Sequence, residues 1–402
     1  MPEKTVNKNI KFYQGTDYLS KNNDEETLKL IKQKLFDLFN MKNINFLFGS
    51  GTSAGSIPTM KGFIEKIESK FQVQSTEEQS FQKLKENNQG NLEDILGVLY
   101  SKRDYQLGIG EEDPLTEALI KIIEDTIFEE INIDLLDSVH ENSMNIYKTF
   151  YQKITYRNKD LSRANVFTTN NDLFNERALD NLNINYNNGF GGGLERFFNP
   201  SRFGYTFSRK IETGLEKYEA LENMIYLYKL HGSINWIEKK GNSLFNIQEI
   251  NIKHTDNKPD ESLLIYPNPL KQGKSLTSPY TDIIREFQKK LLLQNSVLFV
   301  IGYSFSDEHL NNVIYQALSS NSSISIVLFN DCDVADYTNC KKPIFKIDDK
   351  RIYKIFGKDN DKEVHFFDYI VHNLIPNLNE SKDTNLLKDF IDKLSDLQEK
   401  NK

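Results

Sequence analysis

Apolar positions along the chain alternate between helical spacing and short continuous runs. An amphipathic helix is predicted after residue 23, where Asn23 or Asp24 can cap it. Its apolar positions are Leu28, Ile31, Leu35, Leu38 and Phe39. A buried strand over 44–48 follows and ends in a glycine-rich turn over 49–55. A second helix is predicted to begin near Pro58, a residue that suits a first turn. The order is therefore helix, strand, glycine-rich turn and helix.

From residue 71 to 160 the periodicity is helical only, with one apolar stripe around Leu96 and another around Leu119. Strand-like runs return at 165–167, 226–230, 263–266, 297–301, 324–329 and 364–367. The helix after residue 305 is expected to have Ser306 as its cap, with Asp307 and Glu308 in its first turn. An amphipathic helix is expected over 381–402.

Short apolar strands that alternate with helices predict an α/β fold with a doubly wound, mostly parallel sheet. A length of 402 residues fits one large domain with an inserted helical subdomain. We expect a polar arm over 1–22, an α/β domain made of 23–70 and 161–380, and inserted helices over 71–160. The helix over 381–402 completes the chain.

Composition excludes several classes of protein. The net charge of −8 argues against a broad nucleic-acid-binding face, and the basic stretch Lys271 to Lys274 is interpreted as a solvated turn. The two cysteines, Cys332 and Cys340, cannot form a four-thiolate zinc site, and no metal is expected. The N-terminus has no signal-peptide core, and no run of about 18 apolar residues occurs. These features predict a cytoplasmic protein.

The first candidate for chemistry is the turn Gly49-Ser50-Gly51-Thr52-Ser53. Small residues after a buried strand let the backbone approach a pyrophosphate, and the N–H groups at the following helix start can bind it. A tight strand-to-helix turn without any ligand also requires glycine, so this alternative stays open.

The second candidate is Thr168-Thr169-Asn170-Asn171-Asp172, directly after a strand. Ligands of open α/β sheets bind at the carboxyl ends of the strands, where an amide and a carboxylate can bind a ribose and an amide. The alternative is helix capping by Asn171 or Asp172, which explains one polar residue but not the whole run.

Two further candidates also follow apolar strands. His231 and Gly232 come after the run over 226–230, and a lone histidine there is more often structural, although glycine permits close approach of another group. Gly302, Tyr303 and Ser304 form a strand-to-helix turn that simple capping would also explain. Because all four segments follow strands, a doubly wound sheet would bring them to one edge and one crevice.

The order and wording of these four segments resemble the sirtuin superfamily, which carries a G-A-G-x-S turn, a T-Q-N-x-D loop, an H-G dipeptide and a G-T-S turn. The resemblance covers roughly residues 40–370. The stretch from Gly302 to Leu310, GYSFSDEHL, is most similar to divergent sirtuin-like proteins of bacterial antiviral defence. The resemblance implies a Rossmann-like sheet that binds NAD.

The resemblance also implies roles for individual residues. As catalytic residues it implies His231 as the base, Asn170 as a contact of the nicotinamide ribose and Asp172 in the same region. The residues implied to bind the dinucleotide are Gly49, Ser50, Gly51, Thr52 and Ser53 at the phosphates, Thr169 beside them, Gly302, Tyr303 and Ser304 on the adenosine side, and Asn330 at the adenine ribose.

Two departures from the sirtuin pattern bear on activity. Sirtuin deacylases carry a four-cysteine zinc module, for which this chain lacks the cysteines. They also carry a G-I-P-D-F-R segment whose carboxylate grips nicotinamide, and Thr59 stands here in the place of that carboxylate. Both departures favour hydrolysis of NAD, taken as substrate, over deacylation.

The resemblance therefore predicts an NAD hydrolase that depletes NAD as an antiviral effector. A non-enzymatic sensor of NAD or ADP-ribose and an NAD-dependent deacylase remain the alternatives. Because an unregulated NAD hydrolase would harm its host, we expect a restrained homo-oligomer. The resemblance implies a hexameric ATPase of the HerA type as its partner, and no membrane or direct nucleic-acid binding is expected.

Overall fold

The fold is that of a computed structural model, which describes most of the chain. The described residues are 9–155, 157–158, 160–213, 215–239, 246–259, 262–264, 278–330, 340 and 342–376. The expected turn at Lys271 to Lys274, the expected helix over 381–402 and Cys332 lie outside these residues. None of the helices in the described ranges combines the length and apolar composition that crossing a membrane requires.

A ten-stranded sheet forms the centre of the molecule, with the order β2-β1-β16-β15-β14-β3-β4-β10-β5 and β17 paired to β16. Its strands are β1 (Ile10–Gln14), β2 (Asp17–Tyr18), β3 (Asn43–Phe48), β4 (Ala164–Thr168), β5 (Asn185–Asn187), β10 (Met224–Lys229), β14 (Ser296–Ile301), β15 (Ser325–Phe329), β16 (Ile352–Asp359) and β17 (Lys362–Glu363). From β16 to β5 all neighbours are parallel, and β1, β2 and β17 pair antiparallel. The predicted mostly parallel sheet is confirmed.

Helices cover both faces of this sheet, so it is doubly wound as predicted. One face packs against α1 (Asp24–Phe39), α6 (Glu141–Thr155), α7 (Phe174–Asn181), α11 (Phe367–Tyr369) and the π-helical turn η6 (Ile370–Leu374). The other face packs against α9 (Tyr280–Leu291), α10 (Glu308–Ser320) and the short η5 (Pro343–Lys346). Alternate residues of β14 enter the two cores, with Phe299 on the first face and Val300 on the second. Burial on both faces explains why these strands read as continuous apolar runs.

The strand order reverses at β3, because the chain leaves β3 for β4 on one side and later adds β14 on the other. Four neighbouring strands end in one row: Ile301 pairs with Phe48, Phe48 with Thr168, and Thr168 with Lys229. The segments that begin at 302, 49, 169 and 230 therefore leave the sheet side by side. Such a reversal creates the crevice in which open α/β sheets bind their ligands.

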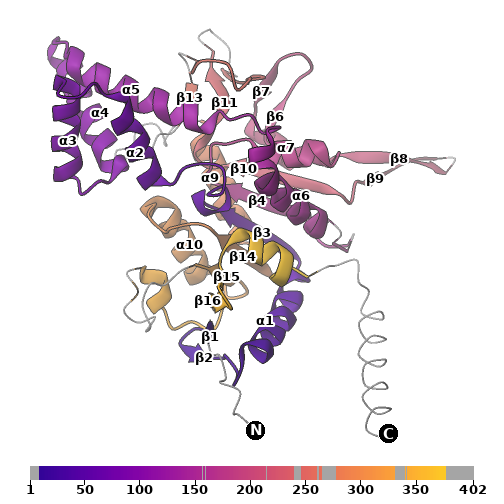
Figure 1. The fold of residues 1–402 in the computed structure, drawn as a ribbon. Coiled ribbons are helices and arrows are strands. Elements are labelled where there is room, and N and C mark those ends of the chain that lie inside the picture. The colour runs from indigo at the N-terminus through magenta and orange to yellow at the C-terminus, as the bar shows by residue number, and fades with distance from the viewer. Residues whose placement is uncertain are drawn as a thin grey trace, which may run out of the picture.

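The inserted helices form a separate cluster. Helices α2 (Met60–Lys70), α3 (Thr76–Asn87), α4 (Leu92–Ile109) and α5 (Pro114–Ile131) share their own apolar core and form a block at the upper left of Figure 1. The predicted boundaries at 71 and 160 stay a prediction. By packing, however, α2 joins this block, whereas α6 lies in the core of the central sheet.

A second, five-stranded sheet follows β5 and has the order β13-β11-β12-β7-β6. It consists of β6 (Phe190–Gly191), β7 (Arg196–Phe198), β11 (Gly232–Glu238), β12 (Ile247–Glu249) and β13 (Ser262–Leu264), and η3 (Pro200–Gly204) follows β7. The hairpin of β8 (Ser208–Thr213) and β9 (Leu215–Ala220) extends away from the rest at the right of Figure 1. The strand expected at 263–266 belongs to this small sheet rather than to the parallel one, because β13 pairs antiparallel with β11.

Two further expectations about elements are corrected. The polar arm expected over 1–22 contains β1, whose alternating side chains Ile10 and Phe12 are buried when it pairs with β16. The strand expected at 364–367 is instead a turn that leads into α11, and β16 supplies the last parallel strand. At the first helix, Asn23 is the cap, accepting a hydrogen bond from the Glu26 N–H at 2.7 Å.

Candidate functional site

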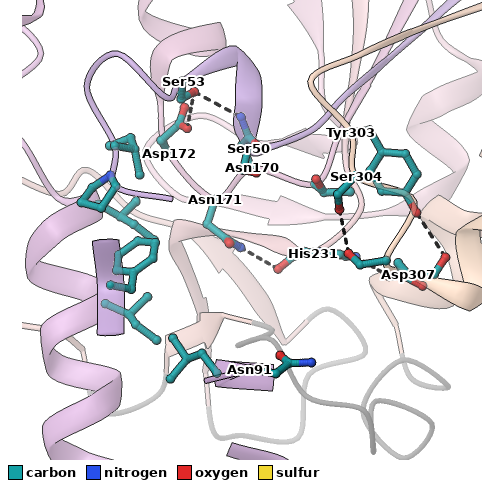
Figure 2. A pocket seen from close by; sticks show the side chains of 18 residues that line it. Ser50, Ser53, Asn91, Asn170, Asn171, Asp172, His231, Tyr303, Ser304 and Asp307 are labelled. Atoms are coloured by element: carbon teal, nitrogen blue, oxygen red, sulfur yellow. Dashed lines mark hydrogen bonds and ion pairs between the residues drawn. The ribbon is translucent and has the colours of Figure 1, made fainter. Parts of the chain in front are cut away.

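The four loops that leave the row of strand ends surround one cavity of about 320 Å³. Its polar side is made by Ser50, Ser53, Thr169, Asn170, Asn171, Asp172, His231, Tyr303, Ser304, Ser306 and Asp307. Ile57 and Pro58 and the helical block complete it, the block contributing Phe63, Leu92, Ile127 and Ile131 beside Asn91. In Figure 2 the labelled side chains of the four loops lie along one side of the cavity, and Asn91 lies apart from them. The cavity thus lies between the carboxyl edge of the sheet and the inserted helices.

The glycines of the first turn are required by contact with the turn after β14. The Gly49 N–H donates to the Ile301 carbonyl and the Gly51 N–H to the Gly302 carbonyl, both at 3.0 Å. A Cβ on Gly51 would lie 2.7 Å from the Gly302 Cα, and one on Gly302 would lie 2.7 Å from the Thr52 N. Gly302 also has a φ of +65°, which favours glycine. The turn itself contains a short 3₁₀ segment, η1 (Ser50–Thr52), and the helix predicted to begin near Pro58 is α2, which begins at Met60.

A buried network of hydroxyls and an amide joins the first two loops. The Asn170 side-chain N–H₂ donates to the hydroxyls of Thr52 at 3.0 Å and Ser53 at 3.1 Å. The Ser53 hydroxyl donates to the Asp172 carboxylate at 2.8 Å, and the Tyr147 hydroxyl donates to Thr52 at 2.9 Å. Burial, and to a lesser extent Asp172, raise the pKa of the Tyr147 phenol, so that Tyr147 keeps its proton. The predicted pair Asn170 and Asp172 is therefore fixed against the glycine-rich turn.

Tyr147 is a residue that the sequence did not single out. It lies on α6, it is fully buried, and its hydroxyl is also 2.9 Å from the Ser53 hydroxyl. In sequence it occupies an ordinary apolar position of an amphipathic helix, so no local signal distinguishes it from core aromatic residues. Only the packing of α6 beneath the glycine-rich turn gives it a polar role.

The loop over 170–172 is also tied to the loop after β10. The Asn171 side chain donates to the carbonyls of His231 at 2.8 Å and Gly232 at 3.2 Å. The second carboxylate oxygen of Asp172 accepts from the Phe174 N–H at 3.1 Å, at the start of α7. The alternative that Asn171 or Asp172 caps this helix is not confirmed, because the N-cap residue of α7 is Leu173; the other oxygen of Asp172 accepts from Ser53.

A buried ion pair between Lys229 and Glu176 holds the loop over 170–172 in place. The ammonium of Lys229 is 3.1 Å from the Glu176 carboxylate, and it donates to the backbone carbonyl of Asp172. Both side chains are almost completely buried. Burial raises the pKa of Glu176, and the Lys229 charge opposes that rise. Sequence reasoning missed Lys229 because it lies in an otherwise apolar strand.

Replacing Lys229 with methionine is expected to destabilise the protein by about 3–5 kcal/mol, because a carboxylate is left buried without its cation. A denaturant titration measures the change. The matched control is Lys239→Met, since Lys239 pairs with Glu195 at 2.9 Å with about half of each side chain exposed. An exposed pair contributes little, so the control should change the free energy of unfolding far less. Equal changes in both variants would contradict the role of Lys229.

His231 and Asp307 meet across the cavity edge. The His231 Nε2 lies 2.9 Å from the Asp307 Oδ2, and the two side chains are 17% and 11% exposed. Asp307 Oδ1 accepts from the backbone N–H groups of His309 at 3.0 Å and Leu310 at 3.2 Å. Asp307 is thus the N-cap of α10, and the expectation that Ser306 caps this helix is wrong. The Asp307 carboxylate is the cap because it accepts from two backbone N–H groups at once, whereas the Ser306 hydroxyl is hydrogen-bonded to the Ser304 hydroxyl at 2.8 Å.

The remaining predicted residues divide into two groups. Tyr303 and Ser304 line the cavity beside His231 (Figure 2). Asn330 lies behind them, where its side chain donates to the Tyr303 carbonyl at 2.7 Å and accepts from Lys342. Gly49, Gly51, Thr52, Gly302 and Asn330 support the lining rather than contribute to it. The implied role of Asn330 at an adenine ribose stays a prediction.

The charge of the cavity indicates which part of a ligand it suits. Among the described residues that line it, the ionisable groups other than the Tyr303 phenol are the carboxylates of Asp172 and Asp307 and the imidazole of His231, with no lysine or arginine. Such a lining favours a cationic group over a phosphate. The described residues contain no cluster of three metal-ligating side chains, and the expectation that no metal is needed stays a prediction.

Comparison with known proteins gives one family match. Residues 164–342 match the family described as "SIR2-like domain", which spans the loops with Asn170, His231 and Gly302 but not the first glycine-rich turn. No curated protein matches the chain. Among solved structures, a complex of a Sir2 homologue with NAD is 13% identical, with a TM-score of 0.40 over 87% of this chain and 94% of that one. A Sir2 homologue variant bound to ADP-ribose is 12% identical, with a TM-score of 0.39 over 87% of this chain and 97% of that one.

Proposed function

We propose that this chain is an NAD⁺ hydrolase that cleaves the nicotinamide–ribose bond and releases nicotinamide and ADP-ribose. The observation that carries the proposal is the convergence of Asn170, Asp172 and His231 on one cavity at the strand reversal. The match of residues 164–342 to a SIR2-like domain supports it.

The lining of the cavity suits the cationic end of NAD⁺. Nicotinamide leaves a pyridinium as a neutral molecule, so no acid has to protonate it. The ribose becomes oxocarbenium-like as the bond breaks, as in glycoside hydrolysis. Two carboxylates stabilise that positive charge, with no lysine or arginine beside them in the described part of the lining, and His231 takes the proton of the attacking water. The phosphates would lie beside Ser50 and Ser53, the two residues of the glycine-rich turn that line the cavity.

Hydrolysis is proposed rather than deacylation for two reasons. The chain has two cysteines where a four-cysteine zinc module needs four. The segment with Ile57 and Pro58 lines the cavity, but Thr59 stands where sirtuins have a carboxylate. A sirtuin deacylase carries both the zinc module and this carboxylate. Hydrolysis, in which water attacks the ribose, requires neither an acylated peptide nor a site that binds one.

The test is incubation of the purified full chain with NAD⁺ while free nicotinamide and ADP-ribose are quantified. Release of both without any added peptide supports the hydrolase. Turnover that requires an acylated peptide would favour a deacylase. Binding of NAD⁺ without release of nicotinamide would favour a sensor.

Replacement of Asn170 with alanine is expected to lower kcat on the order of 10²-fold while NAD⁺ affinity changes much less. The amide contacts the reacting ribose, where its interaction strengthens in the transition state. Steady-state kinetics and calorimetric titration separate the two quantities. Asn145→Ala, at an exposed position of α6, is the control. Wild-type kcat in the Asn170 variant would contradict the assignment.

The biological role is proposed from the sequence resemblance alone. We propose a cytoplasmic effector of antiviral defence that depletes NAD, acts as a homo-oligomer and is gated by a HerA-type hexameric ATPase. Light scattering of the purified chain and comparison of NAD⁺ turnover with and without the ATPase test this role. A fully active monomer at nanomolar concentration would contradict it.

A further inference from the structure

Asp307 has a second contact besides its role as the N-cap of α10: its side chain also pairs with His231. The two side chains come from different loops, yet the Nε2 and Oδ2 atoms are 2.9 Å apart at the edge of the cavity. Both residues line that cavity, and Figure 2 shows their side chains directed toward one another. No role follows for Asp307 from the sequence beyond the first turn of a helix.

The surroundings hold Asp307 in one orientation. Its Oδ1 accepts two backbone N–H groups at the start of α10, which directs Oδ2 toward His231. The Tyr303 hydroxyl contacts the Asp307 carbonyl at 3.2 Å, and Asn311 donates to the Phe305 carbonyl at 2.8 Å. Phe305 has a φ of +62°, a strained conformation for a non-glycine residue. Strain of this kind persists where the surrounding structure enforces a particular geometry.

The chemistry of the two groups then decides the tautomer of His231. An ionised carboxylate only accepts hydrogen bonds, so the His231 Nε2 must carry a proton when it faces Asp307. In the neutral imidazole the other nitrogen, Nδ1, is then the acceptor. A proton taken up at Nδ1 produces an imidazolium, whose charge lies directly beside the Asp307 carboxylate.

We propose that Asp307 is the positioning residue of His231, which sets its tautomer and stabilises its protonated form during NAD⁺ cleavage. This inference rests on the proposed function. As the C1′–N bond breaks, its electron pair goes to the nicotinamide nitrogen, and the oxygen of water forms the new bond to C1′. The water proton passes to His231 Nδ1 and later to solvent. The products are nicotinamide, ADP-ribose and one proton.

The competing interpretation is that Asp307 only caps α10. Asparagine caps a helix about as well as aspartate, so Asp307→Asn preserves the cap. Its amide, however, can donate to Nε2 and thereby reverse the tautomer of His231. Asp113 offers a matched control, because it caps α5 through the N–H groups of Leu115 and Thr116 and does not line the cavity.

The experiment compares wild type, Asp307→Asn and Asp113→Asn. We expect kcat for nicotinamide release to fall about 100-fold or more in Asp307→Asn with little change in KM, and to stay unchanged in Asp113→Asn. Both variants should melt close to wild type. Asp307→Ser, which also caps a helix but cannot reach His231, should lose kcat as well and serves if the asparagine variant misfolds.

A second readout does not depend on turnover. In chains labelled with ¹⁵N-histidine, the ring signals of His231 are assigned by their absence in His231→Ala, and the other five histidines serve as references. We expect a protonated Nε2 in wild type and a protonated Nδ1 in Asp307→Asn. Unchanged kcat or an unchanged tautomer in Asp307→Asn overturns the inference. A wild-type chain that releases no nicotinamide but shows the expected tautomers would overturn the proposed function and leave the pairing standing.

Discussion

Replacing His231 with alanine is expected to lower nicotinamide release from NAD⁺ by about 10²–10⁴-fold, the range that a general base contributes. The imidazole lines the cavity, and the other ionisable groups of the described lining are two carboxylates and the Tyr303 phenol, so no second imidazole is there to take the proton of the attacking water. The variant should still fold, because His231 lies in the loop at the carboxyl end of β10 and its side chain is 17% exposed.

The matched control for this change is His309→Ala. His309 lies two residues after Asp307 and its side chain is exposed, so its replacement should leave turnover unchanged. Nicotinamide release, NAD⁺ binding by calorimetry and the melting temperature are measured for both variants. A His231→Ala chain that hydrolyses NAD⁺ at the wild-type rate would exclude His231 as the base. If wild type releases no nicotinamide and both variants still bind NAD⁺, the chain is a sensor.

The position of the candidate site was predictable because local sequence and global topology agree there. The continuous apolar runs of β3, β4, β10 and β14 indicate strands buried on both faces, and polar or glycine-rich residues follow each run. Since parallel strands point their carboxyl ends to one edge, Gly49, Asn170, His231 and Gly302 had to meet. The strand register then brings Ile301, Phe48, Thr168 and Lys229 into one row.

Elements outside this pattern could not be derived in the same way. The strand β1 has only two buried side chains, Ile10 and Phe12, in a polar context, and its antiparallel partner β16 lies more than 300 residues later in the chain. Four strands of the five-stranded sheet have only two or three residues, too few for a clear period of two, and β11, with seven residues, shows no alternation of buried and exposed positions. Their assignment depends on pairing between distant segments rather than on local pattern.

The side chains that support the site depend on tertiary contacts of the same kind. Asp307 reaches His231 across 76 positions, and Tyr147 reaches Thr52 across 95. Lys229 faces Glu176 from within an apolar strand. Each of these residues fits an ordinary local role, as helix cap, core aromatic or strand residue. Only the folded chain distinguishes them from residues with that role alone.

Gly302→Ala is expected to have the largest effect on the fold of the site. The added Cβ would lie 2.7 Å from the Thr52 N and 2.8 Å from the Gly51 carbonyl carbon, and these backbone atoms cannot move aside as a side chain can. Alanine at a φ of +65° costs about 1–2 kcal/mol, and the overlap adds about 1–3 kcal/mol. The two turns must separate, so the Gly51 N–H loses its bond to the Gly302 carbonyl. NAD⁺ binding should be lost with it.

Gly110→Ala separates the overlap from the backbone conformation. Gly110 has a φ of +77°, and a Cβ there would meet no atom within 4 Å. This variant carries only the conformational cost of about 1–2 kcal/mol and should bind NAD⁺ like wild type. Denaturant titration gives the free energy of unfolding, and calorimetry gives the NAD⁺ affinity. Because both glycines have a positive φ, the difference between the variants measures the contact between the two turns. If Gly302→Ala unfolds like Gly110→Ala and keeps its NAD⁺ affinity, the contact between the two turns does not organise the site.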